Sequence, residues 1–400
     1  MKSGRFLLSI AAQLPWTAAH LVFEKLALAA VVRQREGGSP WGARYECIRA
    51  AWLTEALREQ GALPPGAVVK SFTLERFGEV GQMSALFRLQ LECAGEAEGA
   101  ARLVLKTTTT EMKNRIFNNS FGVFEREIRS YQLPHPERGL LRPRCWVTQQ
   151  NPITKAAFLI MEELSAWRGI GAYDKISPAD ARRLVSALAI HHAQWWQQAE
   201  LKESGFLTTL ETQQQTMGPM CSLAWGRAQK IMTPLVDAEI IGLLADYVKK
   251  QECVSKRLMA APSTLVHGDL NTNNIFFDDA GDRVCAIDWQ STRIGNWAED
   301  LAYANLMCLE TEDYLAHEAG LMELHRQILA QQGIVVKEAD YRECYRLGVL
   351  QVAAMLIVAA MVIDPDKDPA LYERYRSTIS GWATVAKRHQ LQDLLNTLSP

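Results

Sequence analysis

The residues best suited to chemistry lie in 265–300, which reads LVHGDLNTNNIFFDDAGDRVCAIDWQSTRIGNWAED. Two short apolar strands joined by a turn rich in Asp and Gly predict a β-hairpin there. If the turn centres on Gly281, Asn274 stands opposite Asp288, because opposed residues in an antiparallel hairpin have a constant sum of their numbers. Asp269 lies in the loop just before the first strand. The sequence therefore predicts that Asp269, Asn274 and Asp288 gather at one end of the hairpin.

These three side chains offer only oxygen atoms as ligands. Carboxylate and amide oxygens suit Mg²⁺, which binds proteins through one or two such groups and takes its other ligands from phosphates and water. Asp and Asn are also ordinary turn residues, so each of them alone predicts little. Their convergence at one end of a hairpin favours a magnesium site.

Three β-like runs precede this segment in the first part of the chain. They lie at 68–77, 87–92 and 102–106, and the second alternates apolar and polar residues as a half-buried strand does. The glycine-bearing turn between the first two runs predicts an antiparallel meander. A helix is predicted at 121–133 and a further apolar strand at 157–161. This part of the chain is therefore predicted to be rich in β-structure.

Helices dominate the predicted structure after residue 163. Ser177 followed by Pro178 and Asp180 is a typical helix start, with Ser as the N-cap and an acid in the first turn. A polar segment at 213–216 interrupts the apolar pattern before the next helices. These are predicted at 223–250, 311–332, 340–363 and 369–395.

The predicted fold class is α+β, and the chain is expected to have three parts. An apolar or amphipathic helical extension covers 1–42, a β-rich lobe covers 43–165 and a mainly helical lobe covers 166–400. A chain of 400 residues is long enough for two domains of roughly 150 residues each.

A family resemblance rests on the same residues. The loop HGDLNTNN at 267–274 resembles the H-G-D-x-x-x-x-N catalytic loop of aminoglycoside phosphotransferases and choline kinases, which are small-molecule relatives of the protein kinases. Asp288 in the sequence IDWQ resembles the metal-binding aspartate of that group. The segments GVFEREI (122–128), LIMEEL (159–164) and LAIHHAQW (188–195) are similar to the ecdysteroid kinase-like branch. The resemblance covers roughly 43–395.

This resemblance implies a protein-kinase-like fold with two lobes. It also implies an enzyme that transfers the γ-phosphoryl group of ATP to a hydroxyl group. Asp269 would then orient the substrate hydroxyl and accept its proton. Asn274 and Asp288 would hold Mg²⁺. His267 would be a structural hydrogen-bonding residue of the loop, and Asp300 would support the loop from behind.

The resemblance also implies a nucleotide site in the first lobe. Lys106 matches the lysine that holds the α- and β-phosphates, and Glu127 matches the acid that pairs with this lysine. The other candidates belong to the loop that would cover the phosphates and to the hinge whose backbone would bind adenine. They are Gly81, Met83 and Ser84 in the loop, and Met161, Glu162 and Leu164 in the hinge.

Charge and apolar content restrict the partners. The chain has 43 basic and 45 acidic residues, a net charge of −2, which argues against nucleic acid as a partner. The segment 200–257, expected to contribute to the substrate site, has seven acids and seven bases, so it lacks the acidic excess that a polycationic aminoglycoside requires. A group of Trp and Met side chains near it suits either a protein core or a cleft for an apolar molecule. Its members are Trp195, Trp196, Met217, Met220, Trp225 and Met232.

The predicted substrate is therefore an apolar hydroxylated metabolite, such as a steroid, a terpenoid or a lipid-like compound. Asn271 stands where the ecdysteroid kinases have an aromatic residue, usually Trp, which argues against the ecdysteroid itself. A choline, aminoglycoside or hydroxyacyl kinase of the same fold is one alternative. A catalytically inactive nucleotide-binding scaffold is the other, although the set of candidate residues is complete.

The N-terminal segment and the cysteines bear on location. Eight scattered cysteines without a C-x-x-C pair are typical of a reducing compartment, so a cytoplasmic protein is predicted. The apolar stretch 6–32 is interrupted by His20, Glu24 and Lys25 and is too broken for a membrane span. An amphipathic helix packed on the body or on a second subunit, a peripheral membrane helix and a cleaved signal peptide remain open for it.

Overall fold

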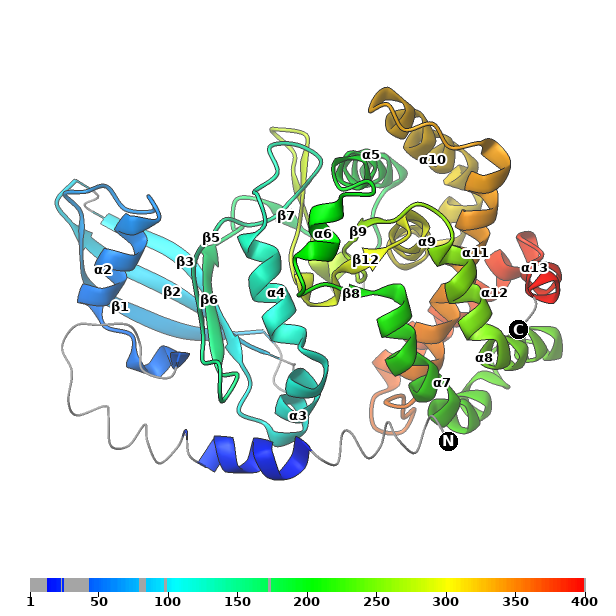
Figure 1. Cartoon of the computed structure of the whole chain (residues 1–400), viewed down its shortest axis with the longest axis horizontal. Coiled ribbons are helices and arrows are strands. Elements are labelled where there is room, and N and C mark those ends of the chain that lie inside the picture. The colour runs from blue at the N-terminus through cyan, green and yellow to red at the C-terminus, as the bar shows by residue number, and fades with distance from the viewer. Residues whose placement is uncertain are drawn as a thin grey trace. The chain divides into compact units, whose positions relative to one another are not determined.

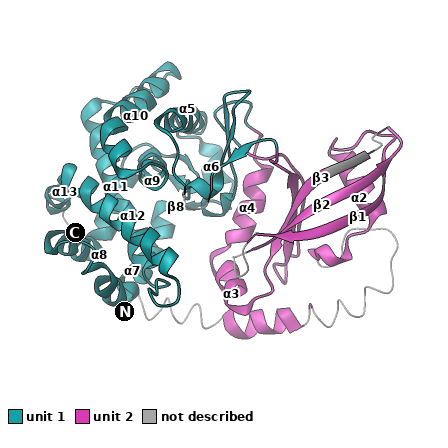
Figure 2. Cartoon of the chain, turned by 180° about the vertical axis from the view of Figure 1, so that it is seen from behind, with its two compact units in different colours: residues 1–6, 136–141, 166–400 teal, residues 7–135, 142–165 magenta. Residues whose placement is uncertain are grey.

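The computed structural model of the chain contains two compact units, which are coloured separately in Figure 2. The smaller unit includes residues 7–135 and 142–165, and the larger unit includes 136–141 and 166–400. The residues that the structure describes are 13–22, 24, 43–78, 84–96, 99–171 and 174–398.

A five-stranded antiparallel sheet forms the centre of the smaller unit (Figure 1). Its strands, in spatial order, are β1 (Val68–Phe77), β2 (Ser84–Ala94), β3 (Gly99–Thr108), β6 (Ala157–Glu162) and β5 (Cys145–Gln150). Every neighbouring pair is antiparallel. The predicted meander of the first three strands is confirmed, and the sheet places Lys106 on a central strand.

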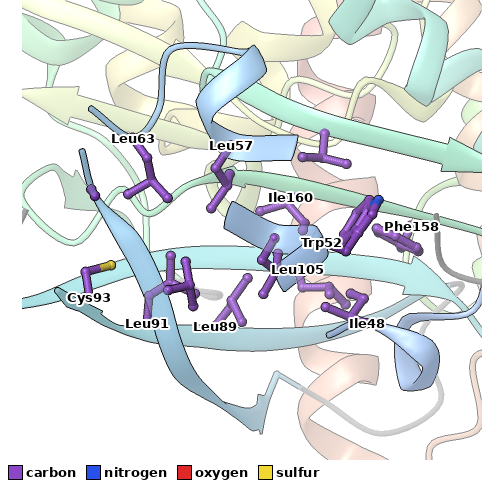
Figure 3. Close-up of a cluster of buried hydrophobic side chains, with 14 residues drawn as sticks. Ile48, Trp52, Leu57, Leu63, Leu89, Leu91, Cys93, Leu105, Phe158 and Ile160 are labelled. Atoms are coloured by element: carbon purple, nitrogen blue, oxygen red, sulfur yellow. The ribbon is translucent and has the colours of Figure 1, made fainter. Parts of the chain in front are cut away.

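The two faces of this sheet carry different cores. Helix α2 (Ala50–Glu59) packs on one face, where the ring of Trp52 meets the ring of Phe158 edge to face at 6.0 Å (Figure 3). Helix α4 (Val123–Gln132) covers the other face, where Ile128 packs with Leu159. Phe158 and Leu159 are neighbours on β6, so the two-residue period of a strand sends them to opposite faces.

The helix predicted at 121–133 is confirmed as α4, and a second helix, which was not predicted, lies directly before it. Helix α3 (Met112–Phe121) ends and α4 begins at Gly122, whose backbone is left-handed with φ 58°. Glycine adopts this conformation without the clash that a Cβ atom causes, so it can end one helix and start the next at an angle. The break leaves α4 free to lie against β5 and β6 with Glu127 buried.

The described part of the N-terminal segment is helical at 13–22 and at residue 24. One side of this helix is buried, with Thr17, Leu21 and Glu24 each less than 9% exposed. The Glu24 carboxylate pairs with Arg115 at 2.8 Å and with Arg44 at 3.0 Å. The ion pair with Arg115 attaches this helix to α3. Breaking it would leave a buried charge without its partner, which is strongly destabilising.

The larger unit is mainly helical, as predicted, and Figure 1 shows its helices gathered around short strands. Its helices are α5 (Pro178–Gln194), α6 (Ala199–Glu203), α7 (Leu210–Met232), α8 (Ala238–Met259), α9 (Trp297–Cys308), α10 (Thr311–Gln331), α11 (Glu338–Ala359), α12 (Pro369–Arg388) and α13 (Leu391–Thr397). Helix α9 packs against α5, α10 and α11. Of the described helices, none is both long and apolar enough to cross a membrane.

Three helix predictions in this unit are wrong at their boundaries. The helix predicted at 223–250 is in fact parts of two helices, because α7 ends at Met232 and α8 begins at Ala238. The polar segment 213–216 lies inside α7, because Thr209 caps the helix by accepting a hydrogen bond from the Thr212 amide. The predicted helix 369–395 is divided into α12 and α13 at Gln390, whose φ is 50°. The start of α5 is confirmed, since the Ser177 hydroxyl accepts from the Asp180 amide at 3.1 Å.

Short strands connect the helices and carry the candidate site. Four strands form one sheet in the order β4 (Leu140–Leu141), β11 (Arg283–Ala286), β10 (Ile275–Asp278) and β7 (Arg168–Gly169). Three others form a second sheet in the order β8 (Thr208–Thr209), β12 (Arg293–Gly295) and β9 (Thr264–Val266). The loop 267–274 runs from β9 to β10 and therefore links the two sheets.

Candidate active site

The hairpin β10–β11 differs from its prediction by one residue. Ile275 pairs with Ala286, so Asn274 stands opposite Ile287, whose amide donates to the Asn274 carbonyl at 2.9 Å. The predicted opposition of Asn274 and Asp288 is wrong, because the turn contains the four residues 279–282 and centres after Ala280. Asp288 follows Ile287, the last residue that bonds across the hairpin, so its backbone does not have to continue the strand.

Asp288 has an unusual backbone. Its φ and ψ of 65° and 59° are left-handed, a conformation that costs most residues about 1–2 kcal/mol and that Asp and Asn tolerate best. Its Oδ2 atom accepts a hydrogen bond from Gln290 Nε2 at 3.2 Å. Residues held in such conformations concentrate at functional sites, where the surrounding structure imposes them.

Asp269 lies at the centre of a set of hydrogen bonds. Its Oδ1 atom accepts from the Tyr303 hydroxyl and from Asn271 Nδ2, both at 2.9 Å. Asn274 Nδ2 donates to the Asp269 carbonyl at 2.8 Å and lies 3.3 Å from Oδ2. Three side chains, two from the loop and one from α9, thus hold one carboxylate in a single orientation.

The environment of Asp269 changes its acidity. Burial disfavours the charged carboxylate and, together with the negative charge of Asp288, raises the pKa of Asp269 to about 6. The hydrogen bonds from Tyr303, Asn271 and Asn274 act in the opposite direction. A carboxylate with a pKa between its ordinary value and neutrality can accept a proton during a reaction and is still mainly ionised at pH 7.

Asp300 supports the loop from behind, in the position that the sequence predicted. Its carboxylate accepts from the His267 amide at 2.7 Å and from the Gly268 amide at 2.8 Å. Burial by itself would raise the pKa of Asp300, but its hydrogen bonds, above all with His192, lower the pKa to about 2. His267 Nε2 bonds the carbonyl of Ile287 at 3.0 Å. The loop is therefore tied both to α9 and to the end of β11.

Helix α9 begins with a capping arrangement that the sequence NWAE encodes. Asn296 Oδ1 accepts from the Ala298 amide at 3.0 Å, and the Glu299 carboxylate accepts from the Asn296 amide at 2.7 Å. This start puts Asp300 in the first turn. Tyr303 follows three residues later, on the same side of the helix, where it reaches Asp269.

Gly268 leaves no room for a side chain. Its φ is 82°, and a Cβ atom there would lie 2.2 Å from Arg293 Nη1 and 2.6 Å from the Ser291 carbonyl oxygen. Arg293 cannot easily withdraw, because its other nitrogen Nη2 pairs with Glu299 at 2.5 Å in a buried site. The glycine therefore lets the loop run directly over this ion pair.

Gly268→Ala is expected to lower the free energy of unfolding by more than about 1–2 kcal/mol, the ordinary cost of a left-handed alanine, because the clash adds to it. Urea unfolding of the purified protein would measure the change. Gly226→Ala is a matched control, since Gly226 lies within α7 with open space around it. This control should stabilise the protein by up to about 1 kcal/mol, and a similar effect of Gly268→Ala would contradict the argument.

The donor set fits a magnesium ion. Asn274 Nδ2 is directed at Asp269, so its Oδ1 atom is the one that can serve as a ligand. Among the described residues no cluster of three or more His, Cys, Asp or Glu side chains could hold a metal ion by itself. A site of one amide oxygen and one carboxylate agrees with a cation that takes its remaining ligands from phosphates and water.

The predicted lysine and glutamate pair forms within the smaller unit. Lys106 Nζ on β3 lies 2.7 Å from Glu127 Oε1 on α4, and both residues are less than 9% exposed. Such a pair holds the ammonium group in a fixed place. Separating the two groups would leave a buried charge without its partner, which strongly destabilises a protein. Ser84 is the first residue of β2, opposite Thr108. Gly81 and Met83 lie outside the described residues.

The hinge candidates lie at the end of β6. The Met161 side chain is buried with Phe124 of α4, so it belongs to the core of the smaller unit. The Glu162 amide donates to the Arg144 carbonyl at 2.8 Å, which engages it within the sheet. Leu164 is buried just beyond the strand. Binding of adenine by backbone groups would therefore fall to the residues that follow Glu162.

Reasoning from the sequence missed Tyr303, Asn271 and His192 as parts of the site. Tyr303 could have been found, because it lies three residues after the predicted Asp300 on one helix. Asn271 attracted notice only as a departure from the family pattern, whereas its amide contacts Asp269 directly. His192 lies beside Asp300 at 3.5 Å, but 108 residues separate the two in sequence.

The predicted Trp and Met group does not form one lining. Met232 is fully buried, and the others are partly buried. Trp196 lines a groove of about 620 Å³ with Trp297, Ile334 and Leu347. The residues of that groove do not include Asp269, Asn274 or Asp288, so Trp196 contributes to a surface separate from the loop 267–274.

Comparison with protein families decides the classification. The model of the ecdysteroid kinase-like family matches residues 81–337, well over half of the chain. The protein belongs to the ecdysteroid kinase-like family. The match includes the loop 267–274 and the β10–β11 hairpin of this family member, and the resemblance predicted from the sequence is confirmed.

Solved structures show the fold of this ecdysteroid kinase-like protein. A microcompartment-associated aminopropanol kinase is 15% identical with a TM-score of 0.53, and the match covers 84% of this chain and 98% of that one. A choline kinase from Cryptosporidium parvum is 10% identical with a TM-score of 0.51, covering 82% and 93%. The predicted α+β fold of the small-molecule kinases is thereby confirmed. Comparison with curated proteins gave no match.

Proposed function

We propose that this protein is an ATP-dependent kinase that transfers the γ-phosphoryl group to a hydroxyl group of an apolar metabolite. The observation that carries the proposal is the arrangement around Asp269: a carboxylate of raised pKa, held by Tyr303 and Asn271, beside the oxygen ligands of Asn274 and Asp288. Membership of the ecdysteroid kinase-like family supports the same reaction.

Asp269 would act on the hydroxyl group of the substrate. Its Oδ1 atom is occupied by two donors, so Oδ2 is the atom that would accept a hydrogen bond from the hydroxyl and, in the transition state, its proton. The carboxylate must be ionised to do this. Phosphoryl transfer needs mainly positioning and electrostatic stabilisation, which a carboxylate held in one orientation provides.

The remaining residues would bind the nucleotide. Asn274 Oδ1 and the Asp288 carboxylate would hold Mg²⁺, whose charge would stabilise the negative phosphate oxygens. Lys106, fixed by Glu127 at 2.7 Å, would bind the phosphates that are not transferred. The ammonium group of Lys106 carries the positive charge that suits the binding of phosphate oxygens.

The substrate class is inferred from charge and family. The segment 200–257 has no acidic excess, which disfavours a polycation. A hydroxylated steroid, terpenoid or lipid-like molecule is therefore the proposed acceptor. The fold is shared with an aminopropanol kinase and a choline kinase, so small amino alcohols are the competing acceptors to test.

The test of this function has two steps. First, Mg·ATP should raise the thermal unfolding temperature of the purified protein, since a ligand that binds only the folded state stabilises it. Second, ATP consumption should be measured with a hydroxysteroid, a terpenoid alcohol, a hydroxy fatty acid, choline and 1-amino-2-propanol. Turnover with the apolar alcohols supports the proposal. Turnover with only the amino alcohols would contradict the substrate class, and no stabilisation by Mg·ATP would contradict nucleotide binding.

The rate should depend on pH through Asp269. Because the base acts in its ionised form and its pKa is raised to about 6, kcat/KM should be constant above pH 7 and fall as the pH drops below about 6. The Tyr303 hydrogen bond lowers this pKa, so Tyr303→Phe should move the acidic limb upward by about one pH unit. Tyr345→Phe removes another buried hydroxyl group, one that bonds Asn305 and Tyr314, and should leave the limb in place. An unmoved limb in Tyr303→Phe would contradict the role of Asp269 as base.

A further inference from the structure

A buried chain of hydrogen bonds leads from the catalytic loop to two distant helices. Asp300 of α9 meets His192 of α5, with Oδ2 and Nε2 3.5 Å apart. His192 Nδ1 lies 3.0 Å from His325 Nε2 on α10, and His325 Nδ1 lies 3.0 Å from the Tyr341 hydroxyl on α11. All four residues are at most 2% exposed. The chain therefore joins four helices through polar groups that water does not reach.

The chemistry of each group sets the direction of donation. An ionised Asp300 can only accept, so His192 must donate from Nε2. Burial and the neighbouring His192 hold the pKa of His325 well below its ordinary value, so His325 is neutral and has one N–H group. With His325 donating from Nε2 and accepting from Tyr341 at Nδ1, each link of the chain is satisfied. Asp300 in turn accepts from the amides of the loop.

Aromatic packing holds this chain in place from the side. The ring of Trp297 stacks on Tyr341 at 4.1 Å between centroids and on His325 at 5.1 Å. Trp297 is the first residue of α9, the helix that carries Asp300. The imidazole and phenol rings therefore have little freedom to turn, and a polar chain that is fully satisfied can fix the orientation of its last member.

We propose that His325 and Tyr341 are positioning residues of the catalytic loop, acting through His192 and Asp300. Asp300 holds the His267 and Gly268 amides, which immediately precede Asp269. If His192 loses its partner, the Asp300 carboxylate can turn, and the loop that it holds can shift. A displacement of about 1 Å at a catalytic group can reduce the rate by up to about 10²-fold. The kinetic consequence rests on the proposed kinase function, but the effect on the loop does not.

The same two helices provide a matched control. Tyr345, on α11, and Tyr314, on α10, are as buried as Tyr341, and their hydroxyl oxygens lie 2.9 Å apart. Tyr345 also accepts from Asn305 at 3.3 Å, and within the described part of the protein its hydroxyl group bonds neither Asp300 nor His192. Tyr345→Phe therefore removes a buried hydroxyl group from the same helix without interrupting the chain.

The experiment compares His325→Leu, His325→Gln, Tyr341→Phe and Tyr345→Phe in the full-length protein. Hydrogen exchange of peptides that contain His267 and Gly268 reports on the loop without requiring activity. We expect His325→Leu to accelerate this exchange by about tenfold or more and to lower kcat by roughly 10–100-fold, with KM for Mg·ATP nearly unchanged. His325→Gln retains an N–H donor for His192 and should recover part of both losses.

Tyr341→Phe removes only one hydroxyl group and keeps the stacking on Trp297, so it serves as the test if His325→Leu does not fold. It should accelerate loop exchange and lower kcat more than Tyr345→Phe does. Equal effects of Tyr341→Phe and Tyr345→Phe on both readouts would overturn the positioning role. The two claims can also fail separately. If His325→Leu and Tyr341→Phe accelerate loop exchange but the wild-type protein transfers no phosphoryl group, the link to the loop is supported and the proposed function is contradicted.

Discussion

Asp269→Asn is expected to lower kcat by about 10²–10⁴-fold, the usual contribution of a general base, while Mg·ATP affinity changes by less than about threefold. The amide has the same shape as the carboxylate, and its oxygen can still accept from Tyr303 and Asn271. What it cannot do is accept a proton from the substrate hydroxyl. Nucleotide binding is assigned to other residues, so it should survive. Steady-state kinetics and calorimetric titration with Mg·ATP measure the two quantities separately.

The control for this substitution should remove the same charge without touching the site. Asp282→Asn does so, because Asp282 lies in the turn of the β10–β11 hairpin with its side chain 83% exposed, pairing with Arg183. A surface ion pair of this kind contributes little, so kcat should remain close to wild type. If Asp269→Asn also kept near-normal kcat, the assignment of Asp269 as base would be wrong.

Asp288→Asn should abolish the dependence of ATP binding on Mg²⁺ and lower kcat by about 10²–10³-fold. The carboxylate is the only charged ligand assigned to the metal, and a metal ion supplies several kcal/mol of stabilisation to a phosphoryl transition state. Asn tolerates the left-handed backbone that Asp288 adopts at φ 65°, so the variant should fold. The loss would therefore report on the metal and not on the hairpin.

Binding of ATP to Asp288→Asn should be titrated with Mg²⁺ and with excess EDTA. The wild-type protein should bind more tightly with Mg²⁺, and the variant should bind equally in both conditions. A variant that retains the wild-type response to Mg²⁺ would show that the metal is held elsewhere. Thermal unfolding of the two proteins without ligand verifies that the fold is unchanged.

Much of the fold could be predicted because its signals are local. The alternation of Phe87, Leu89 and Leu91 with polar residues predicts the strand that became β2, and Ser177 with Pro178 predicts the start of α5. The loop 267–274 could be recognised because its residue types lie at fixed spacings along one stretch of chain. Local patterns of this kind require no knowledge of tertiary structure.

The remaining features depend on geometry that spacing does not encode. The register predicted for the hairpin differs from the observed one by one residue, because the length of the turn, and not the position of Gly281, sets the pairing. The left-handed backbone of Asp288 is imposed by what surrounds it. The hydrogen bond between His192 and His325 joins residues 133 positions apart. Only the packed helices bring these two side chains together.

The most direct test of the account is the identification of a phosphorylated product by mass spectrometry. Wild-type protein and Asp269→Asn would be incubated with Mg·ATP and the panel of apolar alcohols and amino alcohols, and each acceptor would be examined for the addition of one phosphoryl group. We expect the wild type to phosphorylate a hydroxyl group of an apolar alcohol and Asp269→Asn to give almost no product. A wild-type protein that binds Mg·ATP but phosphorylates none of the acceptors, or an Asp269→Asn variant as productive as the wild type, would contradict this expectation.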